Sequence, residues 1–157
     1  MGVRAEHGAV RICGFALVFV AGILACAAAT SVPAKAQLPA GCDSARAWTY
    51  FAAAQREAAR QRYSEAAAWY VAATQATNAC RTPNDSIMRA NSLFGAGTAF
   101  ALSGDALRGL TLLHAAQTEV DTLIHTGDRE AASKGRGILD LIRDVISEIN
   151  TIAKGSM

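Results

Sequence analysis

The sequence YSEAAAWYVAA at residues 63–73 shares one spacing of small and large side chains with GDALRGLTLLHAA at residues 104–116. Each belongs to a longer stretch, and these begin about 43 residues apart, at Ala47 and Ala90. Residues three and four apart share a helical face, so small side chains around a large one let two helices approach closely. We therefore expect a helical repeat scaffold, which usually binds rather than catalyses. The equivalent residues are Ala66, Tyr70 and Ala73, and Gly109, Leu113 and Ala116.

The first 36 residues are typical of a secretory signal peptide. Arg4 and Arg11 give a positive start, and residues 12–29 form an uncharged run rich in Ala, Val, Leu, Ile and Phe. Residues 34–36, Ala-Lys-Ala, match the small-x-small rule for a cleavage site. The sequence therefore predicts a signal peptide over residues 1–36, cleavage after Ala36, and a periplasmic or secreted bacterial protein.

Three other outcomes remain open for this segment. Cleavage after Ala29 also satisfies the rule, because residues 27–29 are all alanine. The uncharged run, about 18 residues long, reaches the lower limit for a membrane span, so an uncleaved anchor is an alternative. The third outcome is lipidation of Cys26, which follows Ile-Leu-Ala and would attach the protein to a membrane.

The charge balance of the mature chain argues against nucleic acid as a partner. The whole chain has 15 Lys and Arg and 13 Asp and Glu. Three of the basic residues and one acidic residue precede Gln37, so the mature chain has equal numbers of both. Such a chain lacks the basic face that nucleic acid or an anionic membrane surface requires.

Two cysteines remain after cleavage, Cys42 and Cys80. An even pair in an exported chain indicates a disulfide, with two buried free thiols as the alternative. Cys42 precedes one predicted helix and Cys80 follows the next, so both lie at the same end of an antiparallel pair. Closing this 38-residue loop would stabilise the fold by about 4 kcal/mol in the chain-entropy model.

High alanine content and few β-branched runs predict an all-α domain. The expected helices span residues 44–60, 65–77, 83–102 and 106–124, and a fifth begins near residue 129 or, because of two early glycines, near Gly137. Their expected caps are Asp43 or Ser44, Ser64, Thr82 and Asp105. The fifth helix carries one apolar stripe, made up of Ile138, Leu141, Ile142, Val145, Ile146, Ile149 and Ile152.

The first four helices carry the small-residue pattern of a known repeat. The first unit has Tyr50, Ala53, Ala54, Ala66 and Tyr70, and the second has Leu93, Ala96, Gly97, Phe100, Gly109 and Leu113. Residues 47–123 thereby resemble tetratricopeptide repeats (TPR), which are helix hairpins of about 34 residues. This sequence departs from the pattern at Glu57, where Tyr is usual, and at Asn78 and Asp121, where Pro is usual.

The resemblance implies two helix hairpins, at about residues 43–79 and 83–125, closed by a capping helix at 129–153. Together they would form one TPR-like domain over residues 37–153, with a disulfide-linked five-helix bundle as the alternative. Members of the family bind ligands along the first helix of each pair. The lining of that groove would be Trp48, Phe51, Gln55, Asn91, Phe94 and Thr98, although Phe51 and Phe94 could equally serve packing.

The sequence shows no catalytic or metal-binding pattern, and we expect no enzyme activity, metal or cofactor. His114 and His125 would lie about 16 Å apart along one helix, too far apart to share a metal ion. We expect a protein–protein interaction module of the bacterial envelope that binds a protein or peptide segment. The alternatives are a structural or lipid-anchored protein that homodimerises through its last helix, and an inhibitor that acts through the loop at residues 81–86.

Overall fold

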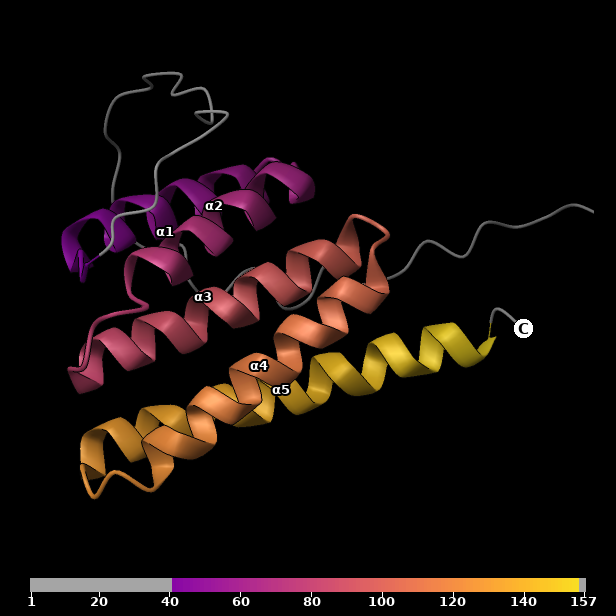
Figure 1. Cartoon of the computed structure of the whole chain (residues 1–157). Coiled ribbons are helices and arrows are strands. Elements are labelled where there is room, and N and C mark those ends of the chain that lie inside the picture. Colours follow the sequence, from indigo (N-terminus) through magenta and orange to yellow (C-terminus); the bar gives the residue numbers. More distant parts are fainter. Residues whose placement is uncertain (1–40, 156–157) are drawn as a thin grey trace, which may run out of the picture. The chain divides into compact units, whose positions relative to one another are not determined.

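A computed structural model of the chain describes residues 41–155, and this part is all-helical, without strands (Figure 1). Its five helices confirm the predicted all-α class. The predictions about the signal peptide, its cleavage and Cys26 lie outside the described residues. The helices are α1 (Ser44–Ala59), α2 (Tyr63–Ala76), α3 (Pro83–Leu102), α4 (Ala106–Ile124) and α5 (Arg129–Gly155).

Short polar side chains start most helices where the sequence predicts them. Asp43, Thr82 and Asp105 each accept a hydrogen bond from the backbone N–H three positions on, at 2.9, 3.2 and 3.2 Å. Asp128 does the same for α5, at 3.0 Å. These bonds satisfy first-turn N–H groups that have no partner within the helix. Because Asp128 provides this cap, α5 begins at Arg129 and not near Gly137.

The turn between α1 and α2 differs from the prediction that Ser64 caps α2. Arg62 occupies the cap position and makes no side-chain capping bond. The reason is Gln61, which adopts a positive φ of 60° and closes the turn early, so that the Arg62 N–H donates to the Glu57 carbonyl at 3.0 Å. The equivalent position 43 residues later is Gly104, with a φ of 96°. Glycine adopts this conformation without strain, whereas glutamine rarely does.

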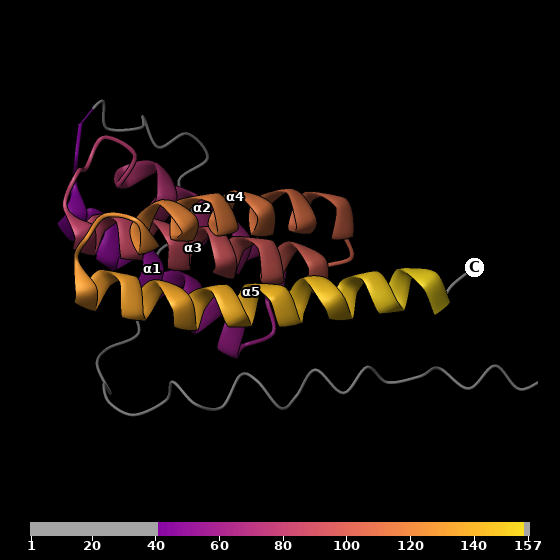
Figure 2. The ribbon, with the colours of Figure 1, turned by 90° about the horizontal axis from the view of Figure 1, so that it is seen from below.

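Each helix packs against the next one in the chain, and α3 also contacts α1 and α5. The core around α1, α2 and α3 consists mainly of alanine, together with Trp69 and Tyr70. The core around α3, α4 and α5 contains larger aliphatic side chains, among them Leu113, Val120 and Ile142. The central helix is therefore α3, which contributes to both clusters (Figure 2).

Small residues allow the close contacts between paired helices. A Cβ atom added at Gly109 of α4 would lie 2.7 Å from the Gly97 carbonyl oxygen of α3, and one added at Gly97 would lie 2.9 Å from the Gly109 carbonyl oxygen. The equivalent residues of α1 and α2, Ala54 and Ala66, are fully buried. These four small residues of the TPR-like pattern are therefore all in the interior.

The predicted apolar stripe of α5 is buried over its first half. Ile138 and Ile142 are buried, and so is Leu139, which the predicted stripe omits. Leu141 is 36% exposed because it lies to one side of the buried face. The C-terminal end of α5 continues past the start of α4 (Figures 1 and 2). Although α5 is the longest helix, no helix of residues 41–155 is long and apolar enough to cross a membrane.

Candidate functional site

Trp48 on α1 is a large aromatic side chain that the core does not cover, since it is 62% exposed. Phe51 lies one turn further along the helix, and the centroids of the two rings are 6.2 Å apart in an edge-to-face arrangement. Gln55, another turn along, is exposed. The indole therefore offers flat apolar area and an N–H donor to a partner, next to an exposed amide.

The other predicted binding residues are partly buried. Phe51 also contacts Tyr70 of α2, with ring centroids 5.4 Å apart, and burial raises the pKa of Tyr70 to about 12. Phe94 packs against the core of α3, α4 and α5, and the Thr98 hydroxyl donates to the Phe94 carbonyl at 3.0 Å. Asn91 is half-buried on α3. Because α1 contacts α3, the six residues lie on neighbouring helices; their role in binding stays a prediction.

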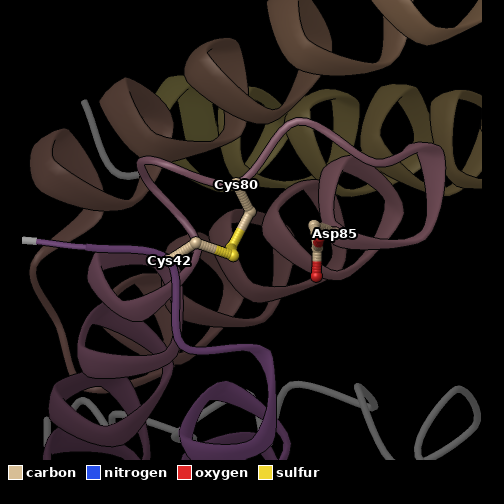
Figure 3. A group of neighbouring side chains, drawn as sticks. All are labelled: Cys42, Cys80 and Asp85. Atoms are coloured by element: carbon tan, nitrogen blue, oxygen red, sulfur yellow. A yellow bond between two sulfur atoms is a disulfide. The ribbon is translucent and has the colours of Figure 1, made fainter.

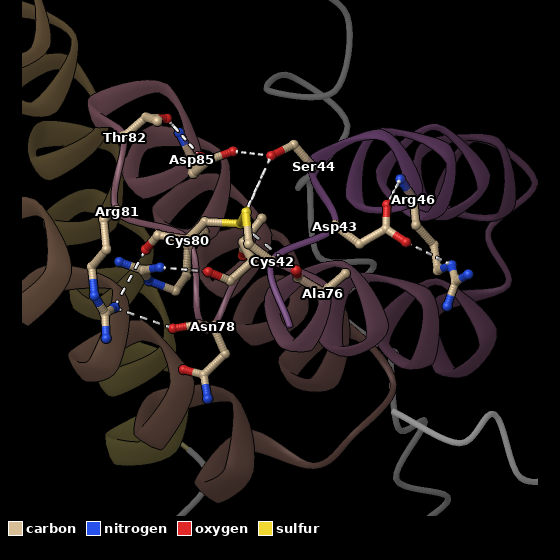
Figure 4. The surroundings of a disulfide bond; sticks show 12 residues. Cys42, Asp43, Ser44, Arg46, Ala76, Asn78, Cys80, Arg81, Thr82 and Asp85 are labelled. Carbon is tan, nitrogen blue, oxygen red and sulfur yellow. Dashed lines mark hydrogen bonds and ion pairs between the residues drawn. A yellow bond between two sulfur atoms is a disulfide. The ribbon is translucent and has the colours of Figure 1, made fainter. Parts of the chain in front are cut away.

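A second cluster joins the start of α1 to the start of α3 (Figure 4). The predicted disulfide links Cys42 to Cys80, with their Cα atoms 4.7 Å apart. Beside it, the Asp43 N–H donates to the Ala76 carbonyl at the end of α2, at 3.0 Å. We name this cluster the clamp and define it as Cys42, Ser44, Cys80, Thr82 and Asp85.

Asp85 is a buried carboxylate in the clamp, only 7% exposed. The Ser44 hydroxyl donates to one carboxylate oxygen and the Thr82 hydroxyl to the other, each at 2.6 Å. These two bonds, with smaller contributions from the Thr82 backbone and the Arg89 charge, favour the ionised form. They lower the pKa of Asp85 below its usual value, although burial alone would raise it.

Asp85 is expected to make the free energy of unfolding depend on pH under acidic conditions. Because its pKa is lower in the folded state, its contribution is fully present above about pH 4 and is lost as the pH falls through the folded-state pKa. We expect Asp85→Asn to lower the free energy of unfolding by about 1–3 kcal/mol at pH 7, and by less below pH 4. Urea unfolding across this range measures the difference. Asp140→Asn, at an exposed carboxylate of α5, is the matched control; a deficit for Asp85→Asn that persists unchanged to pH 2 contradicts the assignment.

Arg89 links three helices, and nothing in the sequence pattern revealed it. Its guanidinium donates to the Thr77 carbonyl at the end of α2, at 2.8 Å, and to the Ser86 hydroxyl at 3.2 Å. It also pairs with Glu119 of α4, and both side chains are largely buried. The Arg89 guanidinium satisfies the Thr77 carbonyl at the end of α2, and the charges of Arg89 and Glu119 neutralise each other. We therefore assign the group a structural role.

Metal-binding chemistry has one candidate location in residues 41–155. The Cys42 and Cys80 sulfurs and an Asp85 carboxylate oxygen lie within 4.8 Å of one another (Figure 3). With the disulfide formed neither sulfur is a thiolate, so this group cannot hold a metal ion in the oxidised chain. His114 is exposed on α4 and His125 is exposed at its C-cap, where the His125 Nδ1 atom lies 2.6 Å from the Asp121 carbonyl oxygen.

Comparison with known proteins adds no family assignment. No protein family, curated protein or solved structure matches this chain.

Proposed function

We propose that this protein is an exported, non-catalytic interaction module that binds a protein or peptide segment across α1 and α3. The observation that carries the proposal is the 62% exposure of Trp48. Covering the exposed part of an indole gains about 2–3 kcal/mol from apolar burial. Tryptophan is also enriched among the few residues that dominate binding energy at interfaces. A partner that buries Trp48 would therefore obtain much of its affinity from that contact.

The register of the helices supports a TPR-like arrangement. Helices α1 and α3 end 43 residues apart, at Ala59 and Leu102, and α2 and α4 begin 43 residues apart, at Tyr63 and Ala106. Helix α5 contacts α4 and α3 as α3 contacts α2 and α1. We infer that α5 takes the place of the first helix of a third unit. In such stacks the first helices of successive units line one extended surface. In this interpretation those helices are α1, α3 and α5, and Trp48 lies on the surface that they line.

Two independent features support export. The disulfide between Cys42 and Cys80 belongs to an oxidising compartment, and residues 1–36 have the three parts of a secretory signal. We therefore place the protein in the periplasm or outside the cell. The mass of the mature chain distinguishes cleavage after Ala36 from cleavage after Ala29 and from lipidation of Cys26.

Trp48→Ala is expected to weaken partner binding by roughly 30-fold or more. Affinity capture from the native envelope identifies the partner, and titration with the purified partner then measures the dissociation constant. Truncating such an anchor costs about 2 kcal/mol or more, which is roughly a 30-fold loss of affinity.

The matched control is Leu107→Ala on α4. Leu107 is 79% exposed and equally apolar, but it lies on a helix outside the proposed surface. We expect this variant to bind as the wild type does. Equal affinities for wild type and Trp48→Ala would refute binding through α1, and loss in Leu107→Ala alone would move the interface to α4.

Homodimerisation through α5 is the second candidate function. It is favoured by Val145, Ile146 and Ile149, which pack against the core of α3, α4 and α5 but remain only half-buried, so apolar surface is left for a second copy. Light scattering of the wild type and of Ile149→Lys tests it, because a dimer built on this face would dissociate in the variant. Ile142 is unsuitable for this purpose, since it is fully buried in the core and its substitution would disrupt the fold itself. A monomeric wild type excludes the dimer.

A further inference from the structure

The clamp brings three metal-ligating side chains to the junction of three helices (Figure 3). Cys42 precedes α1, Cys80 follows α2, and Asp85 lies in the first turn of α3. Their ligand atoms are within 4.8 Å of one another. An ion held by all three would therefore connect the two segments that the disulfide connects, and would also hold the first turn of α3.

The disulfide and a bound ion exclude each other. A small dithiol reduces the S–S bond by transferring two electrons, each sulfur takes up one proton, and the dithiol becomes a disulfide. Metal binding then releases both protons, because the thiolate is the form that ligates. Cys42 is exposed, so a reductant in solution reaches the bond directly.

The separation of the two cysteines suits a single zinc ion. Two thiolates in tetrahedral coordination, with Zn–S distances of about 2.3 Å, lie about 3.8 Å apart. The Cα atoms of Cys42 and Cys80 are 4.7 Å apart, and we expect rotation of the exposed Cys42 side chain to bring the two thiolates to this spacing. Asp85 supplies an oxygen ligand, and the solvent side of Cys42 leaves the fourth position to water.

The surroundings of the three residues favour a divalent cation. The Ser44 and Thr82 hydroxyls already orient the Asp85 carboxylate, as hydrogen-bond donors orient the carboxylate ligands of metal sites. Two thiolates beside this carboxylate would place three negative charges in contact, and a divalent ion neutralises two of them. Thiolate ligands select zinc, and its spectroscopic substitute cobalt(II), over magnesium or calcium.

We propose that the reduced chain binds one zinc ion through Cys42, Cys80 and Asp85, and that the ion replaces the covalent link of the oxidised chain. This inference does not depend on the proposed partner-binding function. It defines two alternative states of the clamp, a disulfide under oxidising conditions and a metal site under reducing conditions.

Cobalt(II) titration of the reduced full-length chain tests the proposal. Cys13→Ser and Cys26→Ser leave Cys42 and Cys80 as the chain's cysteines. We expect a thiolate-to-cobalt charge-transfer band that saturates at one ion per chain and is displaced by zinc. The oxidised chain should give no band. Asp85→Asn should weaken cobalt binding about tenfold or more, since even residues behind the ligands contribute that much.

Further variants separate loss of the site from loss of folding. Cys42→Ser, at an exposed position, should retain the helical circular dichroism spectrum but lose the band, whereas Asp140→Asn should bind cobalt normally. Zinc should also raise the thermal midpoint of the reduced chain, a measurement that needs no substitution at Asp85. Absence of the band, absence of this zinc-dependent rise, or unchanged affinity in a folded Asp85→Asn variant would overturn the proposal.

Discussion

Gly109→Ala is expected to lower the free energy of unfolding by about 2 kcal/mol, even though alanine favours helix more than glycine does. The added Cβ atom would lie 2.7 Å from the Gly97 carbonyl oxygen and 3.0 Å from the Ala101 backbone nitrogen. Backbone atoms cannot rotate away, so α3 and α4 must separate along their contact. Overpacking of this kind costs up to about 3 kcal/mol, and the better helix propensity returns about 1 kcal/mol.

Gly137→Ala on α5 is the matched control for this substitution. An added Cβ atom there meets nothing within 4 Å, so only the helix propensity changes, and we expect stabilisation by about 0.5–1 kcal/mol. The urea midpoint, measured by circular dichroism, should therefore fall for Gly109→Ala and rise for Gly137→Ala, although the chemical change is the same. If both variants are stabilised, the close approach of α3 and α4 is wrong.

Loss of the disulfide is expected to lower the free energy of unfolding by about 4 kcal/mol, the effect of a closed 38-residue loop on the unfolded chain. Small domains are stable by only about 5–15 kcal/mol, so this is a large share of the total. Urea unfolding with and without a reductant, in the Cys13→Ser, Cys26→Ser background, measures the difference. A metal chelator should be present, so that no ion replaces the link.

The control for reduction is the double substitution Cys42→Ala, Cys80→Ala. It should match the reduced chain in stability and should not respond to the reductant, which separates loss of the link from other effects of the reagent. A difference below about 1 kcal/mol between oxidised and reduced chains would mean that the unfolded loop gains little freedom when the link opens.

Helix boundaries were largely predictable because local chemistry determines them. Thr82 and Asp105 start helices at the predicted places through bonds to N–H groups three residues away. Ser64 failed as a predicted cap because Gln61 takes the left-handed conformation, which a sequence reading assigns to glycine or asparagine. An error of this kind arises where the fold imposes a conformation that the residue itself does not favour.

The polar contacts of the clamp and the Arg89–Glu119 ion pair could not be predicted from the sequence. The disulfide follows from counting cysteines, but the Ser44–Asp85 bond joins residues 41 positions apart, and the Arg89–Glu119 pair joins residues 30 apart. Both depend on how separate helices pack, which no local spacing encodes. The same limit applies to Trp48, because its exposure depends on which helices leave that face of α1 uncovered.

The bond between Cys42 and Cys80 also determines how mechanical tension would pass through this domain. A pull on the backbone ahead of Cys42 reaches Cys80 through the sulfur atoms, so residues 43–79 between them bear no load. Fully extended, those residues would add about 130 Å of length, and this length becomes available only when the disulfide is broken. Traction from the amino-terminal side would therefore act first on α3, while the pair formed by α1 and α2 is shielded from it.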